Sequence, residues 1–361
     1  MTNLRMASVA DLNSFDEIID ARSPAEFLED HIPGAINLPV LDNDERAEVG
    51  TLYKQVSSFA AKKVGAPLVW RNIARHLETH FKDKPKNWHP LIYCWRGGSR
   101  SGSLVYVLQQ IGFNAQQLEG GYKAYRRVVL NDLALLPQRY SFHVISGPTG
   151  SGKTRLLQSL ARLGGQVLDL EKLAAHRGSL LGALPDQAQP NQKSFESAIW
   201  HALRSFDPAR VVFVESESKR IGVLCVPEAL IYRMRASPCI QLDVAQNLRV
   251  DLLLEEYAHF FAQPDLLRHQ LECLVPLRGR DTVAAWHALI DAQDWRGLFD
   301  DLLSKHYDPA YARSLSTNYA ASEHGPDYFV RDISYAGFEA LATQILNEHD
   351  VVLPITAPSP V

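Results

Sequence analysis

Residues 91–101 are Leu91-Ile92-Tyr93-Cys94-Trp95-Arg96-Gly97-Gly98-Ser99-Arg100-Ser101, and this stretch decides the fold of the first part of the chain. The apolar run before Cys94 predicts a buried strand, and the apolar spacing of residues 103–111 predicts a helix. Backbone N–H groups converge where a glycine-rich loop enters a helix, and the helix dipole favours negative charge there. The sequence therefore predicts that Cys94 is a thiolate nucleophile in a cradle for an oxyanion.

The cradle also carries two arginines. We predict that Arg96 and Arg100 act with Cys94 in catalysis, because both cations favour a thiolate and bind anions. The loop N–H groups that would bind a phosphate-like group belong to Gly97, Gly98 and Ser99. The alternative is an inert buried cysteine beside a glycine turn. Packing alone gives no reason for two arginines and two glycines at this spacing.

A second motif follows farther along the chain. The run Gly147-Pro148-Thr149-Gly150-Ser151-Gly152-Lys153-Thr154 fits the phosphate-loop pattern G-x-x-x-x-G-K-[ST]. A strand pattern precedes it and a helix pattern follows it, which is the context that the motif requires; the alternative is a glycine turn before a helix. Loop amides cradle phosphates, the lysine reaches a terminal phosphate, and the hydroxyl can bind Mg²⁺. The predicted phosphate-binding residues are Gly147, Gly150, Ser151, Gly152, Lys153 and Thr154.

Composition limits the possible classes of protein. The 361 residues are enough for two or three domains, and 46% of them are hydrophobic. The net charge of -4 gives no overall basic field, so any site for a polyanion must be a local patch. The four cysteines form no C-x-x-C pair, which argues against zinc and dithiol chemistry. We expect no signal peptide, no membrane span and a cytoplasmic location.

Strand and helix patterns alternate in the first part, which predicts an α/β fold with a mostly parallel sheet. Expected strands are 17–20, 35–38 and 115–118, and expected helices are 24–30, 69–81 and one from Tyr122. In the second part we expect strands at 167–169, 211–214 and 239–242, and only helices from Val244 onward. The predicted domains are 1–138, 139–243 and a helical extension, 244–361, that ends in a loose tail.

Glu215 ends the buried strand 211–214, where phosphate-loop domains usually place the carboxylate linked to Mg²⁺. With Thr154 it forms the predicted metal site, and Glu217 and Asp169 are rivals. A structural role for Glu215 is the alternative, either at the strand end or in a pair with Lys219 or Arg220.

The first domain resembles the rhodanese family. The resemblance rests on Asp20-Ala21-Arg22-Ser23, Glu26-Phe27, His31-Ile32-Pro33-Gly34-Ala35 and Leu118-Glu119-Gly120-Gly121-Tyr122, and it places Cys94 at the sulfur-carrying position. The whole chain resembles the tRNA 2-selenouridine synthase family, which joins a rhodanese domain to a phosphate-loop domain. The segments that carry this likeness are Gly50-Thr51-Leu52-Tyr53-Lys54, the two loops, His176-Arg177-Gly178-Ser179 and Tyr307-Asp308-Pro309-Ala310-Tyr311.

The resemblance implies a selenotransferase with geranyltransferase activity. It implies that geranyl diphosphate alkylates wobble 2-thiouridine in tRNA, and that selenophosphate then supplies selenium through Cys94. No tightly bound cofactor is expected, Mg²⁺ is possible, and an enzyme that makes selenophosphate is a possible partner. The C-x5-R spacing of Cys94 and Arg100 is one residue longer than the usual sulfurtransferase loop and resembles cysteine phosphatases. We therefore expect a pocket sized for phosphate, with attack of Cys94 on selenium as one hypothesis and direct attack of selenophosphate on the base as another.

A tRNA must reach both sites, and arginines and tyrosines are the residues that contact phosphates and stack on bases. Arg177 is expected to face bound phosphates. The residues predicted to bind tRNA are Arg249, Arg278, Arg280, Tyr307, Tyr311 and Arg313, and the alternative is the face around Lys54, Lys62 and Arg96.

Other functions remain open from the sequence. The alternatives are a cysteine phosphatase fused to a nucleotide-binding domain, a thiosulfate sulfurtransferase, and a nucleotide-gated binding module without catalysis. A sulfurtransferase does not need residues 139–361, and a binding module does not need a reactive Cys94.

Overall fold

The computed structural model describes residues 4–179, 181–184, 187–318 and 324–350, and the chain divides into two compact units. Unit 1 comprises Met1–Asp132 and Asn191–His201, and unit 2 comprises Leu133–Pro190 and Ala202–Val361. Helices α5 (Gly121–Leu135) and α8 (Gln192–Ser205) each begin in unit 1 and end in unit 2. The predicted domain ranges stay a prediction, and the predicted tail lies outside the described residues.

Unit 1 is built on a parallel sheet in the order β1-β5-β4-β2-β3. Its strands are β1 Met6–Ala7, β2 Glu17–Asp20, β3 Ile36–Asn37, β4 Pro90–Tyr93 and β5 Gln116–Leu118. Besides α5, its helices are the 3-10 helix Val9–Ser14, α1 Pro24–Glu29, α2 Asn43–Gln55, α3 Ser58–Thr79 and α4 Ser99–Ile111. The core lies between sheet and helices and includes Ile19, Ile92 and Leu104. The predicted parallel α/β architecture is confirmed.

The helical hairpin α2–α3 differs from the prediction. The expected helix 69–81 is only the second half of α3, and α2 was not predicted. Pro67 lies inside α3, and several apolar residues of the hairpin are exposed, among them Val56, Phe59 and Trp70. Because these residues do not follow an apolar stripe that faces the core, the sequence pattern does not indicate an amphipathic helix.

Unit 2 contains a second parallel sheet, in the order β12-β11-β6-β8-β7, and a small antiparallel pair, β9 and β10. The strands are β6 Ser141–Ser146, β7 Gln166–Leu168, β8 Val211–Glu215, β9 Arg220–Ile221, β10 Leu224–Cys225, β11 Cys239–Val244 and β12 His324–Val330. The expectation that only helices follow Val244 is wrong, because β12 returns to this sheet and pairs with β11.

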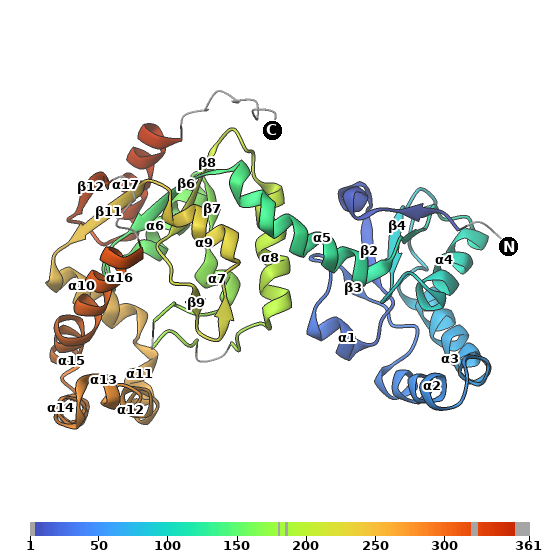
Figure 1. Ribbon diagram of the computed structural model, residues 1–361, viewed down its shortest axis with the longest axis horizontal. Coiled ribbons are helices and arrows are strands. Elements are labelled where there is room, and N and C mark those ends of the chain that lie inside the picture. The colour runs from blue at the N-terminus through green and yellow to red at the C-terminus, as the bar shows by residue number, and fades with distance from the viewer. Residues whose placement is uncertain (1–3, 180, 185–186, 319–323, 351–361) are drawn as a thin grey trace. The chain divides into compact units, whose positions relative to one another are not determined.

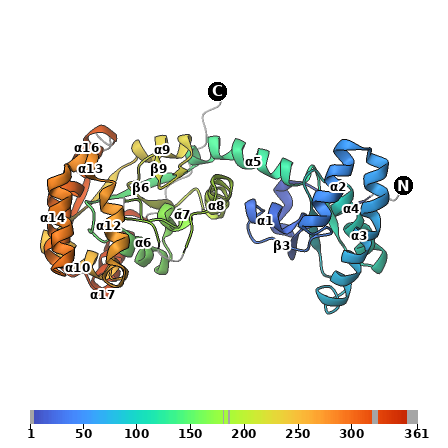
Figure 2. The same cartoon turned by 90° about the horizontal axis from the view of Figure 1, so that it is seen from below.

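The helices of unit 2 cover the sheet and extend it. They are the 3-10 helix Leu136–Arg139, α6 Lys153–Arg162, α7 Leu170–Ala174, α9 Glu228–Arg235, α10 Gln246–Glu256, α11 His259–Ala262, α12 Pro264–Glu272, α13 Val275–Arg278, α14 Arg280–Asp291, α15 Trp295–Leu302, a π-helix Leu303–Tyr307, α16 Asp308–Asn318 and α17 Tyr335–His349. Figure 1 and Figure 2 both show α12, α13 and α14 side by side at one end of this unit. Trp286 and Phe299 lie in the core of this helical group.

Within the described residues, no helix combines the length and the apolar character that a membrane span requires. The cysteines Cys94, Cys225, Cys239 and Cys273 are free thiols.

Candidate functional site

Cys94 lies between the end of β4 and the start of α4, as the sequence predicts. Its side chain is buried, and two donors point at its sulfur: the N–H of Gly98 at 3.3 Å and the hydroxyl of Ser101 at 3.0 Å. Gln117 Nε2 donates to Ser101 Oγ at 2.7 Å, which directs the Ser101 proton toward the sulfur. A thiolate accepts both hydrogen bonds more strongly than a thiol, so this arrangement suits a nucleophile.

Two glycines hold the Cys94 loop against the turn after β5. Gly97 has φ 63° and Gly121 has φ 58°, values that favour glycine. A Cβ on Gly121 would lie 2.2 Å from the carbonyl oxygen of Cys94, which leaves no space for a side chain. The N–H of Tyr122 also donates to that carbonyl at 2.8 Å. The turn therefore fixes the backbone of the loop.

The two arginines of the loop differ in their surroundings. Arg96 is exposed, whereas Arg100 binds Glu26 through Nη1 at 2.6 Å and Nη2 at 3.2 Å, and Arg46 approaches the same carboxylate at 3.5 Å. Burial raises the pKa of Glu26, but the hydrogen bonds and charge of Arg100 outweigh it, so the pKa lies below its ordinary value. The role of both arginines at an oxyanion stays a prediction. Glu26 joins the site, although the sequence indicated only its place in the family signature.

The phosphate loop connects β6 to α6 in unit 2. Gly150 and Gly152 have φ 79° and 76°, and a Cβ on Gly152 would lie 2.2 Å from the ring of Phe338. Lys153 Nζ donates to the carbonyl of Gly147 at 2.8 Å. Its ammonium thus lies across the mouth of the loop, where a phosphate oxygen would compete for it.

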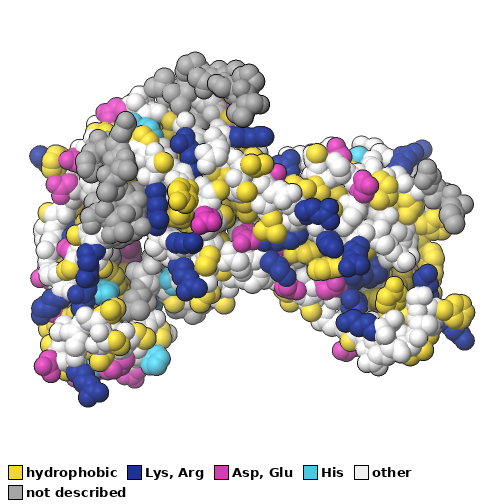
Figure 3. Space-filling model, in the orientation of Figure 1, with side chains coloured by type: hydrophobic (Ala, Val, Ile, Leu, Met, Phe, Trp, Pro, Cys, Tyr) yellow, Lys and Arg dark blue, Asp and Glu magenta, His cyan; other side chains and the backbone are white. Residues whose placement is uncertain are grey.

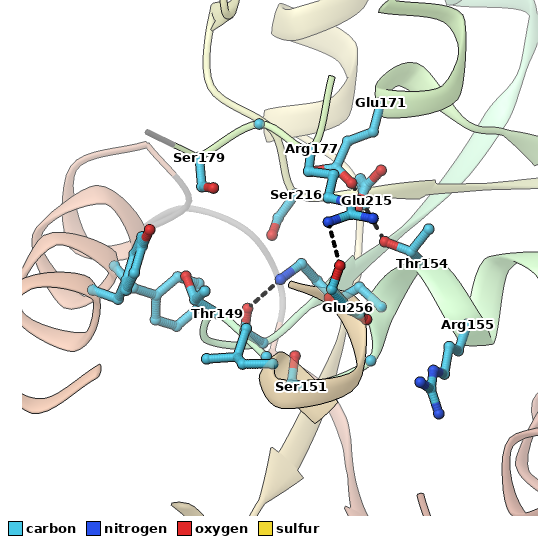
Figure 4. A pocket seen from close by; sticks show the side chains of 18 of the residues that line it. Thr149, Ser151, Thr154, Arg155, Glu171, Arg177, Ser179, Glu215, Ser216 and Glu256 are labelled. Atoms are coloured by element: carbon cyan, nitrogen blue, oxygen red, sulfur yellow. Dashed lines mark hydrogen bonds between the residues drawn. The ribbon is translucent and has the colours of Figure 1, made fainter. Parts of the chain in front are cut away.

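Three carboxylates gather beside this loop. Glu171, Glu215 and Glu217 each bring one oxygen within 4.8 Å of the others, and Thr154 Oγ1 donates to Glu171 Oε2 at 3.3 Å (Figure 4). Glu215 is 1% exposed, and neither of its carboxylate oxygens has a hydrogen-bond partner among the described residues. Buried carboxylate oxygens without partners need a cation or protons. The donor set of carboxylates and a hydroxyl fits Mg²⁺, which prefers oxygen ligands.

Asp169, a predicted rival for the metal, instead caps α7 by accepting from the N–H of Lys172 at 2.8 Å. Sequence reasoning missed Glu171 as a metal candidate. The sequence gives only a weak indication of this role, because Glu171 lies two residues after Asp169 inside the short helix α7. Only the packing of β7 beside β8 brings Glu171 close to Glu215.

The pKa values of the cluster follow from burial. Burial raises the pKa of Glu171 to about 8, and repulsion from Glu217 adds to this effect. Burial also raises the pKa of Glu217 to about 7 and that of Glu215 well above its ordinary value. Lys153 opposes these shifts through its positive charge. The cluster therefore holds protons near neutral pH that a divalent cation must displace.

A pH-dependent stability follows. In the unfolded chain these carboxyls titrate near pH 4.5, whereas in the folded protein Glu217 and Glu171 keep their protons to about pH 7 and 8, and the pKa of Glu215 lies well above its ordinary value. The folded state binds more protons in between, so the free energy of unfolding falls as the pH rises through this window. In EDTA, the thermal midpoint is expected to fall from pH 6 to pH 8.5, and to fall less in Glu215→Gln. Mg²⁺ is expected to raise the wild-type midpoint at pH 8 more than that of the variant.

Exposed Glu339 on α17 provides the matched control for this experiment. Glu339→Gln should follow the wild type at every pH. Identical pH profiles of the wild type and Glu215→Gln would show that the cluster does not carry this dependence.

The remaining walls of the pocket come from other elements of unit 2. The cavity has a volume of about 780 Å³ and includes Arg177, Tyr257 and Tyr311 in its lining. Arg177 Nη1 donates to the carbonyl of Glu256 at 2.8 Å (Figure 4). Its guanidinium lies 5.1 Å from the ring centre of Tyr257. Tyr311 Oη and Ser146 Oγ share a hydrogen bond of 2.8 Å. Arg177 thus lines the same pocket as Lys153, while its contact with phosphate stays a prediction.

Among the residues predicted to bind tRNA, Arg249 is in the wrong place, because its side chain is buried. It is 5% exposed, donates to the carbonyl of Thr149 at 2.9 Å and pairs with Asp308 at 2.5 Å. Its guanidinium is held between the phosphate loop and α16, so it cannot bind the tRNA backbone. Tyr307 is likewise buried. Arg278 donates to the carbonyl of His306, and the exposed residues among the rest are Arg280 and Arg313.

These two units define a class of protein, a rhodanese-like domain joined to a phosphate-loop α/β domain. The model of the rhodanese-like domain family matches residues 6–127, and the model described as "tRNA 2-selenouridine synthase AAA domain" matches residues 140–271. The chain belongs to the tRNA 2-selenouridine synthase family, on the strength of these matches and of the relatives below.

The tRNA 2-selenouridine synthase of Cupriavidus necator is 33% identical over 336 residues, which cover 82% of this chain and 87% of that protein. The synthase of Nitrosomonas europaea is 37% identical over 245 residues, 66% of this chain and 63% of that protein. The chain thus spans a little less than two thirds of the Nitrosomonas relative. Among solved structures, a rhodanese-related protein from Thermoplasma volcanium matches with a TM-score of 0.23 and 19% identity, over 34% of this chain and 91% of that chain.

Proposed function

We propose that the chain is a tRNA 2-selenouridine synthase that replaces the sulfur of wobble 2-thiouridine by selenium. Membership of the family supports this, and one observation carries it. The chain combines a buried cysteine whose sulfur accepts two hydrogen bonds with a phosphate loop beside three carboxylates. Sulfur transfer alone requires only the first site, and nucleotide binding alone requires only the second. Exchange of sulfur for selenium in two steps uses both.

The first step in this proposal is alkylation at the phosphate loop. The 2-thio sulfur attacks the geranyl carbon of geranyl diphosphate, a C–S bond forms, and diphosphate leaves with the electron pair of the C–O bond. Loop N–H groups, Lys153 and Arg177 bind the leaving group and stabilise its developing charge. Thr154, Glu171, Glu215 and Glu217 would hold Mg²⁺, which neutralises diphosphate when bound. Alkylation converts a poor leaving group on the base into geranylthiol.

The second step brings selenium through Cys94, and the electron balance decides how. Attack of a thiolate on the selenium of selenophosphate would leave the electron pair of the P–Se bond on phosphorus. The product would then be a phosphorus(III) species, two electrons more reduced than phosphate. Attack on phosphorus instead breaks the P–Se bond, releases selenide with the electron pair and leaves a thiophosphate ester that water hydrolyses to phosphate. We therefore place Cys94 attack at phosphorus, which suits its C-x5-R loop. Selenide then adds to C2 of the base and geranylthiolate leaves.

The proposal also covers the substrates of the enzyme and the reaction that must precede it. Its substrates are tRNA that carries 2-thiouridine, geranyl diphosphate and selenophosphate, without a tightly bound cofactor. A cytoplasmic enzyme that makes selenophosphate must act before it.

Incubation of the purified chain with 2-thiouridine tRNA, geranyl diphosphate, Mg²⁺ and selenophosphate tests the proposal. Mass spectrometry of the nucleosides should show S-geranyl-2-thiouridine without selenophosphate and 2-selenouridine with it. Each selenouridine formed should release one phosphate and one geranylthiol. Unchanged 2-thiouridine in both reactions would contradict the proposal, and sulfur transfer from thiosulfate to cyanide in the same preparation would favour a sulfurtransferase.

A further inference from the structure

Unpaired positive charge in unit 1 gathers on residues 49–77 of the hairpin α2–α3, a segment that neither site uses, whereas the acidic residues of the hairpin, Asp44, Glu45, Glu48 and Glu78, lie outside it. Residues 49–77 contain five lysines and arginines and no aspartate or glutamate, in a chain with a net charge of -4. All five are exposed, and none forms an ion pair with another described residue; they are Lys54, Lys62, Lys63, Arg71 and Arg75. Several arginines of unit 2, by contrast, are paired with aspartates, namely Arg249, Arg268 and Arg296.

The exposed positions of α3 lie on one face of the helix. They recur at spacings of three and four residues from Phe59 to Arg75, which places them in a stripe about 24 Å long at 1.5 Å per residue. The opposite face is buried and includes Ala61, Gly65 and Ile73. The exposed side chains therefore all lie on the same side of α3 along the length of the stripe.

Aromatic side chains lie within this basic stripe and at its end. Phe59 is 76% exposed and Trp70 is 47% exposed on α3, and Tyr53 is 62% exposed in the last turn of α2. On the face of unit 1 that Figure 3 shows, basic and hydrophobic side chains lie next to one another in the region of α2 and α3. Exposed aromatic rings between free cations indicate a partner that offers both phosphates and flat apolar surfaces. Unpaired RNA offers both.

The hairpin begins beside the Cys94 loop. Arg46 in the first turns of α2 contacts Glu26, which binds Arg100. The two helices run antiparallel, since Asn72 Nδ2 on α3 donates to Glu45 Oε2 on α2 at 2.7 Å. The tip of the hairpin, residues 53–59, is therefore about 20 Å from the first turn of α2, at 1.5 Å per residue for its 13 residues.

We propose that the hairpin α2–α3 is a tRNA-binding surface that holds the RNA beside the Cys94 loop. Lys54, Lys62, Lys63, Arg71 and Arg75 bind phosphates, and Tyr53, Phe59 and Trp70 stack on unpaired bases. The choice of tRNA as the RNA rests on the proposed function. The surface has an alternating basic and aromatic pattern rather than a continuous apolar band, which favours RNA over a lipid membrane.

The experiment measures binding of 2-thiouridine tRNA to the full chain by fluorescence anisotropy across a salt series. The slope of log affinity against log salt concentration is about -0.7 for each phosphate contact. At ~0.15 M salt, the loss of one contact therefore weakens binding about fourfold. Lys62→Glu combined with Lys63→Glu should thus weaken binding by about fifteenfold or more and flatten the log–log slope by about 1.4. Exposed Lys82 and Lys86, in the same unit, provide the matched control, and their double reversal to glutamate should leave the slope unchanged.

Two further measurements separate binding from folding and catalysis. Phe59→Ala should weaken binding by about five- to hundredfold, the usual worth of one stacked base, and Phe59→Tyr should restore it. The charge reversal should raise the KM for tRNA and leave kcat unchanged, with a thermal midpoint like that of the wild type.

Wild-type slope and affinity in the Lys62/Lys63 variant would overturn the proposal for the hairpin and leave the proposed function untouched. Failure of the wild type to bind any tRNA would contradict the proposed function itself. Binding of the wild type to vesicles of anionic phospholipid, but not to tRNA, with loss in the variant, would assign the surface to a membrane and also overturn the proposal.

Discussion

Cys94→Ser is expected to abolish the formation of 2-selenouridine while S-geranyl-2-thiouridine accumulates in the tRNA. A serine hydroxyl is almost wholly neutral at pH 7, and the two hydrogen bonds that Gly98 and Ser101 donate cannot make it an effective nucleophile toward selenophosphate. Loss of a catalytic nucleophile costs up to about 10⁶-fold in kcat in a well-studied serine protease. In the proposed mechanism alkylation uses only the phosphate-loop site, so it should continue.

Nucleoside mass spectrometry and phosphate release measure both steps in one reaction. Cys273 is exposed and lies in unit 2, so Cys273→Ser is the matched control and should keep both activities. A normal rate of selenouridine formation in Cys94→Ser would mean that selenophosphate reacts with the base without help from Cys94. Loss of geranylation together with selenation would mean that the variant is misfolded or that both reactions use Cys94.

The two loops could be predicted from the sequence because their information is local. A glycine-rich run between an apolar strand and a helix predicts a phosphate cradle wherever it occurs, and both Cys94 and Lys153 lie where that pattern places them. The parallel sheets follow from the alternation of strand and helix. The family resemblance then connects the two loops.

Other elements depend on residues far apart in the sequence. β12 is preceded and followed by helical patterns, and its place at the edge of the second sheet comes from pairing with β11, as in Cys239 with His324 and Val244 with Val330. The hairpin α2–α3 was predicted only in part because its outer face carries apolar residues that a core-facing pattern would bury. The exposed apolar residues that made the hairpin hard to predict are thus the same residues that suggest a binding surface.

The charge of a residue in the sequence does not by itself predict its role in the folded protein. Arg249 resembles a candidate for RNA binding in the sequence, but Asp308 and the carbonyl of Thr149 hold it inside unit 2. Glu171 shows the opposite case, because nothing near it in the sequence indicates that it will meet Glu215 and Glu217. In both cases the partner that decides the role lies more than 40 residues away, at positions 308 and 215.

Lys153→Ala is expected to weaken the use of geranyl diphosphate by about ten- to hundredfold. Loss of a charge-assisted contact to phosphate costs roughly 1.5–3 kcal/mol, which gives this range. Lys153 also lowers the pKa of Glu171, Glu215 and Glu217, so its removal should raise these values further. The lost phosphate contact acts on the proposed alkylation step, and single-turnover geranylation across geranyl diphosphate concentrations measures it.

The decisive part of this experiment is a rescue. The Cys94 loop lies in the other compact unit and does not include Lys153, so tRNA that already carries S-geranyl-2-thiouridine should be converted to 2-selenouridine by Lys153→Ala at nearly the wild-type rate. Exposed Lys172 on α7 is the control, and Lys172→Ala should keep normal geranylation. If pre-geranylated tRNA does not rescue a folded Lys153→Ala enzyme, the phosphate loop serves the selenium step or tRNA binding, and the division of labour between the two sites must be rejected.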